Sequence, residues 1–119
     1  MQTIKRTKTY IIDIDGTICS NDNYEEGNYR KCYPLKDRIK VINQLYSKGN
    51  TIIYFTARGM GRHKGNAFNA YNEFHELTKK QLDKWGVKYN KLILGKPSGD
   101  VYIVDKGIKA DDFFTDEAR

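Results

Sequence analysis

The feature that most constrains this chain is a pair of aspartates that directly follows a short apolar stretch. Residues 10–12 (Tyr-Ile-Ile) have the composition of a buried strand, and Asp13 and Asp15 follow at alternate positions before Gly16. Because alternate residues of a strand share a face, we expect both carboxylates at the carboxyl end of this strand. Two neighbouring carboxylates are costly unless hydrogen bonds or a cation compensate their charge, and Mg²⁺ prefers such oxygen ligands. An Asp-Gly turn with two solvated acids is the simpler alternative.

The rest of the chain alternates strand-like and helix-like segments. Strands are predicted at residues 9–14, 51–55, 91–94 and 101–104, and helices at residues 35–48 and 67–85. Strands that alternate with helices form parallel sheets through right-handed crossovers. The sequence therefore predicts one α/β domain over residues 1–119, a Rossmann-like three-layer α/β/α sandwich with a mostly parallel sheet. The aromatic residues of the tail, at 113–114, are expected to dock on this sheet.

Composition indicates a globular protein with an anionic partner. The 119 residues are 39% hydrophobic and 30% charged, and the net charge is +6 without a block of like charges. This charge favours a phosphorylated metabolite or a nucleic acid but does not choose between them. No apolar run approaches membrane-spanning length, and residues 1–9 lack the apolar core of a secretory signal. A cytoplasmic protein with no membrane partner is therefore expected.

Cysteine and histidine spacing does not point to a zinc site. Cys19 and Cys32 are the only cysteines, and His63 and His75 are not placed to complete a set of ligands. Free thiols are the expected state in a chain without a secretory signal. The sequence assigns no role to any of these four residues.

Two polar segments are expected at the mouth of a site formed by the strand ends. Residues 19–33 are predicted to form a flap, and residues 59–66 a loop that carries Arg62 and Lys64. The chain has no larger insertion that could close over the site. An open site of this kind admits a large substrate or is covered by a partner subunit, which would make the protein a homo-oligomer.

Polar and charged side chains recur where the predicted strands end. Thr56 follows the second strand, Lys96 the third and Asp105 the fourth, which adds them to the aspartate pair. The carboxyl ends of parallel strands meet at one edge of a sheet, where open α/β sheets bind ligands. Together with residues 13–17 (Asp-Ile-Asp-Gly-Thr), this order resembles the four signatures of the haloacid dehalogenase (HAD) superfamily of Asp-dependent phosphohydrolases, over nearly the whole chain. The resemblance implies a HAD-like fold without a large cap.

Three short sequence segments resemble those of a narrower group within that superfamily. They are residues 55–59 (Phe-Thr-Ala-Arg-Gly), 81–87 (Gln-Leu-Asp-Lys-Trp-Gly-Val) and 95–97 (Gly-Lys-Pro). The group consists of small, capless phosphatases connected with capsule and surface-polysaccharide biosynthesis. The resemblance implies that residues 1–119 form a single HAD-like phosphatase domain whose partner is a phosphorylated small molecule such as a sugar phosphate.

The chemistry of phosphate esters gives these residues roles. A carboxylate that attacks a phosphate monoester forms an aspartyl-phosphate and divides hydrolysis into two steps, and Asp13 is assigned this role. Asp15 would protonate the leaving oxygen and then deprotonate the attacking water. Mg²⁺ would neutralise charge, held by Asp13, by Asp105 and, as the resemblance implies, by the Asp15 carbonyl. The predicted phosphate and substrate contacts are Thr56, Ala57, Arg58 and Lys96, with Thr56 and Lys96 also assigned to catalysis.

Each of these contacts has a simpler alternative. Thr56 at a strand end can make a local turn bond, and Lys96 and Arg58 can be solvated surface groups. The chain also departs from the resemblance at one position. Where the fourth signature usually carries two adjacent acids, this sequence has Val104 before Asp105.

Other functions remain open at this point. If Val104 replaces a metal ligand, the protein is a weakened catalyst or a phosphate-binding module without turnover. A polynucleotide 3′-phosphatase shares the chemistry, and the +6 charge suits it, although no basic stripe is visible. A signalling receiver domain fits less well because no aspartate follows residues 51–55. A glycosyltransferase Asp-x-Asp site would need a longer chain for its two substrates.

Overall fold

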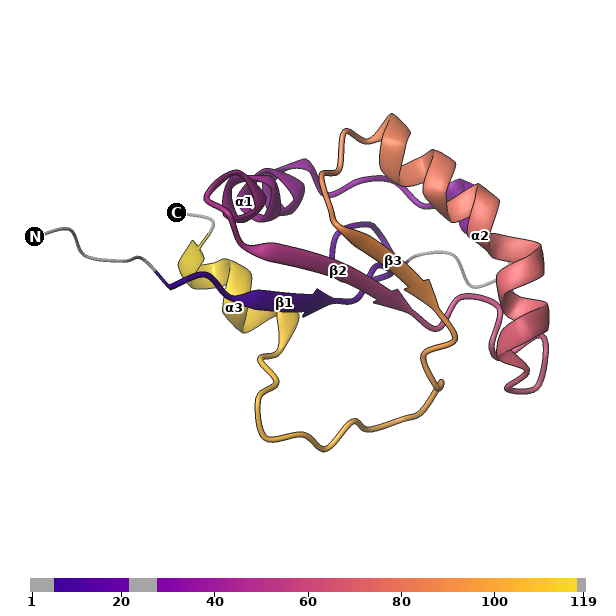
Figure 1. Ribbon diagram of the computed structural model, residues 1–119. Helices are drawn as coiled ribbons and strands as arrows, with labels where there is room; N and C mark the ends of the chain where they lie inside the picture. The colour runs from indigo at the N-terminus through magenta and orange to yellow at the C-terminus, as the bar shows by residue number, and fades with distance from the viewer. Residues whose placement is uncertain (1–5, 22–27, 118–119) are drawn as a thin grey trace, which may run out of the picture.

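A three-stranded parallel sheet forms the centre of the computed structural model, which describes residues 6–21 and 28–117 (Figure 1). The strands are β1 (Thr9–Ile12), β2 (Thr51–Thr56) and β3 (Lys91–Leu94), in the order β1-β2-β3. The helices are the 3₁₀ turn η1 (Tyr29–Lys31), α1 (Lys36–Ser47), α2 (Ala67–Lys84) and α3 (Ala110–Glu117). The predicted α/β fold with a parallel sheet is confirmed, and the bounds of the two predicted helices were placed to within one residue.

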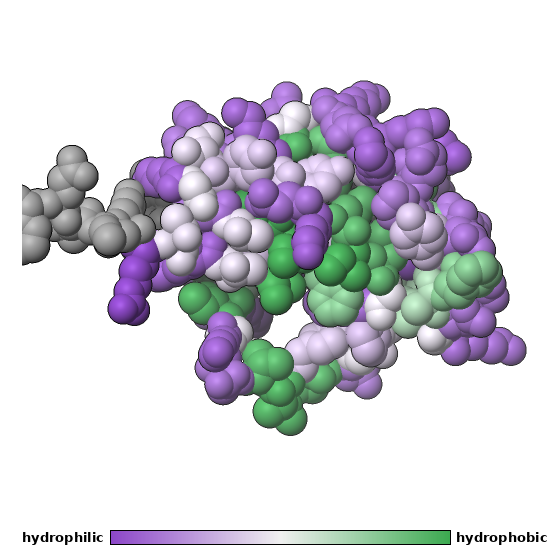
Figure 2. All heavy atoms as spheres, in the orientation of Figure 1, coloured by the Kyte–Doolittle hydropathy of each residue, from purple (hydrophilic) through white to green (hydrophobic). Residues whose placement is uncertain are grey.

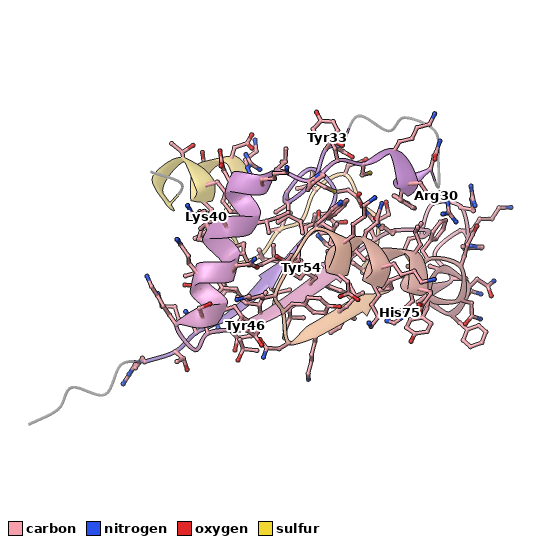
Figure 3. All side chains as sticks on the ribbon, turned by 90° about the horizontal axis from the view of Figure 1, so that it is seen from above. Arg30, Tyr33, Lys40, Tyr46, Tyr54 and His75 are labelled. Carbon is pink, nitrogen blue, oxygen red and sulfur yellow. The ribbon has the colours of Figure 1, made fainter. Side chains whose placement is uncertain are left out.

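Alternating burial along β2 shows which face of the sheet is covered. Ile52, Tyr54 and Thr56 are buried, whereas the residues between them are partly exposed. The helices α1 and α2 lie over the buried face (Figure 1), and Tyr54 lies between them in the view from above (Figure 3). The buried side chains of these two helices are Ile39, Val41, Ile42, Ala70, Phe74, Thr78 and Leu82. Each large apolar side chain buried here contributes about 1.5–3 kcal/mol, so this face holds the sheet and helices together.

The C-terminal segment forms a helix that the sequence pattern did not predict. Its aromatic residues dock as expected: Phe113 meets the Tyr10 ring of β1 edge-on, with 6.3 Å between centroids, and Phe114 is buried. Arg38 of α1 lies over the Phe114 ring at 4.7 Å and pairs with Asp111 at 2.8 Å. These contacts fix α3 beside β1 and α1.

The predicted fourth strand at residues 101–104 is wrong. Residues 95–109 form one long loop without helix or strand, which runs below the sheet before it reaches α3 (Figure 1). Val101 and Ile103 are 74% and 93% exposed, and Figure 2 shows apolar residues of this loop with open space between them and the body of the molecule. β-branched residues favour strands because they pack beside a partner strand, and this segment has not paired with one. The strand β1 is therefore an edge of the sheet, with Ile11 exposed.

Candidate active site

Three of the residues singled out by the sequence meet at the carboxyl ends of the strands. Asp13 follows β1, Thr56 ends β2 and Lys96 follows β3. The Lys96 Nζ lies 3.7 Å from Asp13 Oδ2, and the Lys96 backbone N–H donates to the Thr56 carbonyl over 3.1 Å. The Asp13 side chain is 40% exposed, so a ligand can reach this carboxylate.

The surroundings of Asp13 act on its protonation in both directions. Burial raises the pKa of Asp13, and the nearby Asp15 charge adds to this effect. The backbone N–H of Ile14, which donates to Asp13 Oδ1 over 2.9 Å, and the Lys96 ammonium lower the pKa of Asp13 but do not cancel the effect of burial. A carboxylate whose pKa is raised by burial has lost part of its hydration. Its negative charge is therefore more strongly attracted to a cation or an electrophile.

Thr56 is buried, and its hydroxyl oxygen takes part in a local turn. Thr56 Oγ1 accepts the backbone N–H of Arg58 over 3.2 Å. The hydroxyl proton remains available for a second acceptor. The local bond is the simpler alternative for this residue, and phosphate contacts by Thr56 and Ala57 stay predictions.

The turn after β2 depends on Gly59. Its φ of +80° is a left-handed conformation that glycine adopts without a steric penalty. The Gly59 N–H donates to the Tyr29 hydroxyl over 2.9 Å. A Cβ at this position would lie 2.5 Å from Cδ2 of Phe74, so the turn rests directly on α2.

We expect Gly59→Ala to lower the free energy of unfolding by about 2–4 kcal/mol, because it combines a strained φ with overpacking against buried Phe74. Gly65→Ala is the matched control, since Gly65 has a φ of +84° but no atom lies within 4 Å of its Cβ position. The difference between the variants in chemical denaturation isolates the steric part, expected at about 1–3 kcal/mol. Equal losses would show that Phe74 moves aside freely.

Arg58 is turned into the interior by this turn and is only 2% exposed. Its Nε and Nη2 donate to the two oxygens of Asp15, each over 2.9 Å. Its Nη1 donates to Thr78 Oγ1 over 3.2 Å and to Gln81 Oε1, and a second bond from Nη2 reaches Cys19 Sγ at 3.9 Å. A guanidinium carries five N–H donors, so this set of partners uses all of them. A phosphate contact by Arg58 stays a prediction. In this arrangement Arg58 has no N–H left to donate to a phosphate.

Aromatic and amide groups hold the guanidinium from the other side. Arg58 Cζ lies 4.7 Å from the centre of the Tyr29 ring, which packs edge-on against Phe74 at 4.9 Å. Gln81 Nε2 donates to the Tyr29 carbonyl over 2.7 Å. Burial acts to lower the pKa of Arg58, but the Asp15 carboxylate more than offsets it, so the pKa of Arg58 is raised and the side chain is charged.

Two buried thiols complete the surroundings of Asp15. The Sγ atoms of Cys19 and Cys32 each lie 3.5 Å from Asp15 Oδ1. Burial raises the pKa of both thiols, and the Asp15 charge adds to this effect. Both cysteines are therefore neutral S–H donors to the carboxylate, and both are free thiols, as predicted. The backbone bond from Ser20 N–H to the Tyr33 carbonyl, 2.8 Å long, joins the two segments that carry them.

The two polar segments predicted at the site mouth are placed differently. Residues 22–27 of the predicted flap at 19–33 lie outside the described residues. The loop at residues 59–66 is held on α2, where Glu73 pairs with Arg62 and accepts a hydrogen bond from His63 Nε2 over 2.6 Å. His75 stacks on Tyr71, with 4.4 Å between ring centroids.

The predicted Mg²⁺ ligands are only partly brought together. Asp105 lies on the exposed loop 95–109 and, among the described residues, belongs to no group of three acidic, histidine or cysteine side chains with ligand atoms within 4.8 Å. The group that does meet this distance consists of Asp15, Cys19 and Cys32, but the Arg58 cation already occupies both carboxylate oxygens. Mg²⁺ keeps several waters and needs few protein ligands beside a phosphate. The exposed carboxylate of Asp13 therefore fits the ion, and Asp105 does not in this conformation.

The interior partners of Asp15 were not identified from the sequence. Thr78 lies on the buried face of α2, and Gln81, three residues further along, contacts the same guanidinium. Polar residues at that spacing on a buried face need a polar partner, which is the signal that could have led to Arg58.

The fold has relatives among solved structures. A crystal structure of a structural-genomics target from Vibrio cholerae has 27% sequence identity and a TM-score of 0.79, over 90% of this chain and 87% of that chain. A chain in the structure of the Pnkp1/Rnl/Hen1 complex has 20% identity and a TM-score of 0.56, over 98% of this chain but 37% of that chain. No family model and no curated protein matches the sequence. None of the described helices is long and apolar enough to cross a membrane. These similarities show the α/β fold of the chain.

Proposed function

We propose that this protein is a phosphomonoester hydrolase that forms an aspartyl-phosphate at Asp13, with a sugar phosphate or a related small metabolite as substrate. The observation that supports this most directly is the 3.7 Å approach of Lys96 to the 40% exposed side chain of Asp13 at the strand ends. A lysine beside a reactive carboxylate attracts a dianionic ester and stabilises the charge that develops on its oxygens. The net charge of +6 also favours an anionic substrate.

The proposed reaction has two steps. In the first, an Asp13 oxygen attacks phosphorus, an acyl-phosphate bond forms, and the bond from phosphorus to the leaving oxygen breaks while Asp15 gives that oxygen a proton. In the second, water attacks phosphorus, Asp15 takes a proton from the water, and the bond to Asp13 breaks with release of inorganic phosphate. Lys96 neutralises phosphoryl oxygens in both steps. Bound Mg²⁺ would supply further charge neutralisation, held by the Asp13 carboxylate and the Asp15 carbonyl.

The test is phosphate release from an aryl phosphate and a panel of sugar phosphates and 3′-phosphorylated oligonucleotides, with Mg²⁺ or with a chelator. We expect turnover that requires Mg²⁺ and is fastest with a small sugar phosphate. Fastest turnover of the oligonucleotides, with a steep loss in salt, would indicate a nucleic-acid end as the substrate. An absence of release across the panel, together with no acid-stable labelling by a ³²P-ester, would contradict the hydrolase.

A phosphate-binding module without turnover is the second candidate. The observation that favours it is the position of Asp105, which lies exposed on the loop 95–109 beside Val104 and, among the described residues, joins no group of three candidate metal ligands. Calorimetric binding of a sugar phosphate in Mg²⁺, without release of phosphate from the same ester, would select this candidate.

A further inference from the structure

We propose that Arg58 is a positioning residue that fixes the Asp15 carboxylate for proton transfer, and that it does not contact the substrate. The proposal rests on the hydrolase function proposed above. Its basis is the pair of 2.9 Å bonds from Nε and Nη2 to the two Asp15 oxygens, together with the commitment of the remaining donors to Thr78, Gln81 and Cys19.

The fork geometry is what positions the carboxylate. An aspartate side chain has two torsions, and a single hydrogen bond leaves rotation about the last of them free. Two parallel N–H···O bonds from a planar guanidinium fix both oxygens at once. A lysine at position 58 would keep the charge but could not make this pair of bonds.

The guanidinium is in turn held by rigid elements. Thr78 and Gln81 both project from α2, and the Tyr29 ring lies over Arg58 at 4.7 Å. Arg58 is 2% exposed, so a rotation of its side chain toward a ligand would break the ion pair with Asp15 and leave that carboxylate without its counter-charge. The same burial makes a phosphate contact by this side chain costly.

The hydrogen bonds also distinguish the two oxygens of Asp15. Oδ1 accepts from Arg58 Nη2 and from both thiols, at 3.5 Å for each sulfur. Among the described residues, Oδ2 accepts from Arg58 Nε alone. Within the described part of the chain, Oδ1 therefore faces three donors and Oδ2 one, so a further hydrogen bond has more room at Oδ2. The structure assigns Oδ2 as the oxygen that gives and takes the proton in the reaction.

The experiment compares two esters, an alkyl phosphate and a dinitrophenyl phosphate, by single-turnover release of the leaving group and by steady-state kinetics. Release of an alcohol needs a proton from Asp15, whereas release of dinitrophenolate does not. We expect Arg58→Lys to slow alkyl release by about 10- to 100-fold, with KM unchanged and dinitrophenolate release within about threefold of wild type. Thr78→Val, which removes one acceptor of Nη1 and keeps the side-chain shape, is expected to show the same pattern with a smaller loss.

Arg38→Lys is the matched control, because Arg38 also pairs with an aspartate, at 2.8 Å, and lies over an aromatic ring, at 4.7 Å, but is not bonded to the Asp15 carboxylate. It is expected to leave the ratio of the two release rates unchanged. Equal slowing of both esters by Arg58→Lys and by Thr78→Val would overturn the proposal in favour of a purely structural role. A raised KM with unchanged kcat would overturn it in favour of a substrate contact.

Failure of the proposed function would be seen separately, as a wild-type protein that releases neither leaving group. The arrangement around Arg58 then has its own readout in the NMR spectrum of protein with ¹⁵N-labelled arginine. We expect the Nε–H of Arg58 to exchange with solvent far more slowly than those of exposed arginines. Fast exchange of the Arg58 Nε–H in the wild type would overturn the proposed positioning whatever the activity.

Discussion

Asp13→Asn is expected to abolish turnover, with a loss of roughly 10⁴-fold or more in kcat, because it removes the nucleophile and leaves no oxygen able to form the acyl-phosphate. Labelling by a ³²P-ester after acid quench should disappear together with phosphate release. Asp37→Asn, at an exposed position in the first turn of α1, is the control and should retain full activity. Labelling that persists in Asp13→Asn would place the nucleophile elsewhere.

The same substitution carries an expectation for stability. Burial raises the pKa of Asp13, so the folded state at neutral pH holds a carboxylate that it solvates less well than the unfolded chain does. The asparagine variant should therefore be at least as stable as the wild type at pH 7. As the pH falls through the raised pKa of Asp13, the wild-type side chain becomes neutral and this difference should disappear. Greater stability of the wild type at neutral pH would contradict the raised pKa.

Asp15→Asn should have the opposite consequence and destabilise the protein by about 3–5 kcal/mol. It leaves the Arg58 cation, whose side chain is fully buried, without a counter-charge, and it turns an amide N–H toward guanidinium donors. For a domain of this size the melting temperature should fall by roughly 10–20 °C, measured by circular dichroism.

The control for Asp15→Asn is Asp111→Asn, which makes the same chemical change in the Arg38–Asp111 pair. Asp111 is exposed, and exposed pairs contribute little, so no measurable change in melting temperature is expected. If the two variants behave alike, the Arg58–Asp15 pair is solvated in solution and the positioning role loses its basis.

Local patterns in the sequence were sufficient for most of the fold. The apolar run before Asp13 and the helical spacing of α1 and α2 identify elements whose apolar faces have a single way to pack. Residues 101–104 show where such reasoning fails, since β-branched residues indicate a surface that packs well but do not supply a neighbouring strand. The strand prediction was correct for β1, β2 and β3, which pair with one another, and wrong for residues 101–104, which have no partner strand.

The candidate site also contains residues that the sequence predicted and contacts that it did not. Asp13, Thr56 and Lys96 were found because each follows a strand, and parallel strands bring their ends together. The destination of Arg58 could not be read from the sequence because its partner Asp15 lies 43 residues away. Its direction depends on the left-handed turn at Gly59, which a lone glycine in a sequence does not specify. Prediction therefore found the residues at the strand ends and missed the interior contacts of Arg58 with Asp15, Thr78 and Gln81.

The two thiols beneath Asp15 also make the site observable from outside. They are the only cysteines in the 119 residues, and both are buried. Cys19 has no exposed surface and Cys32 only 8%, so labelling by a bulky thiol reagent is expected to report on the local opening of the segments around Asp15 and Arg58. Thiol labelling can therefore be followed as a probe of the candidate site. The sequence has no exposed cysteine that would add a background signal.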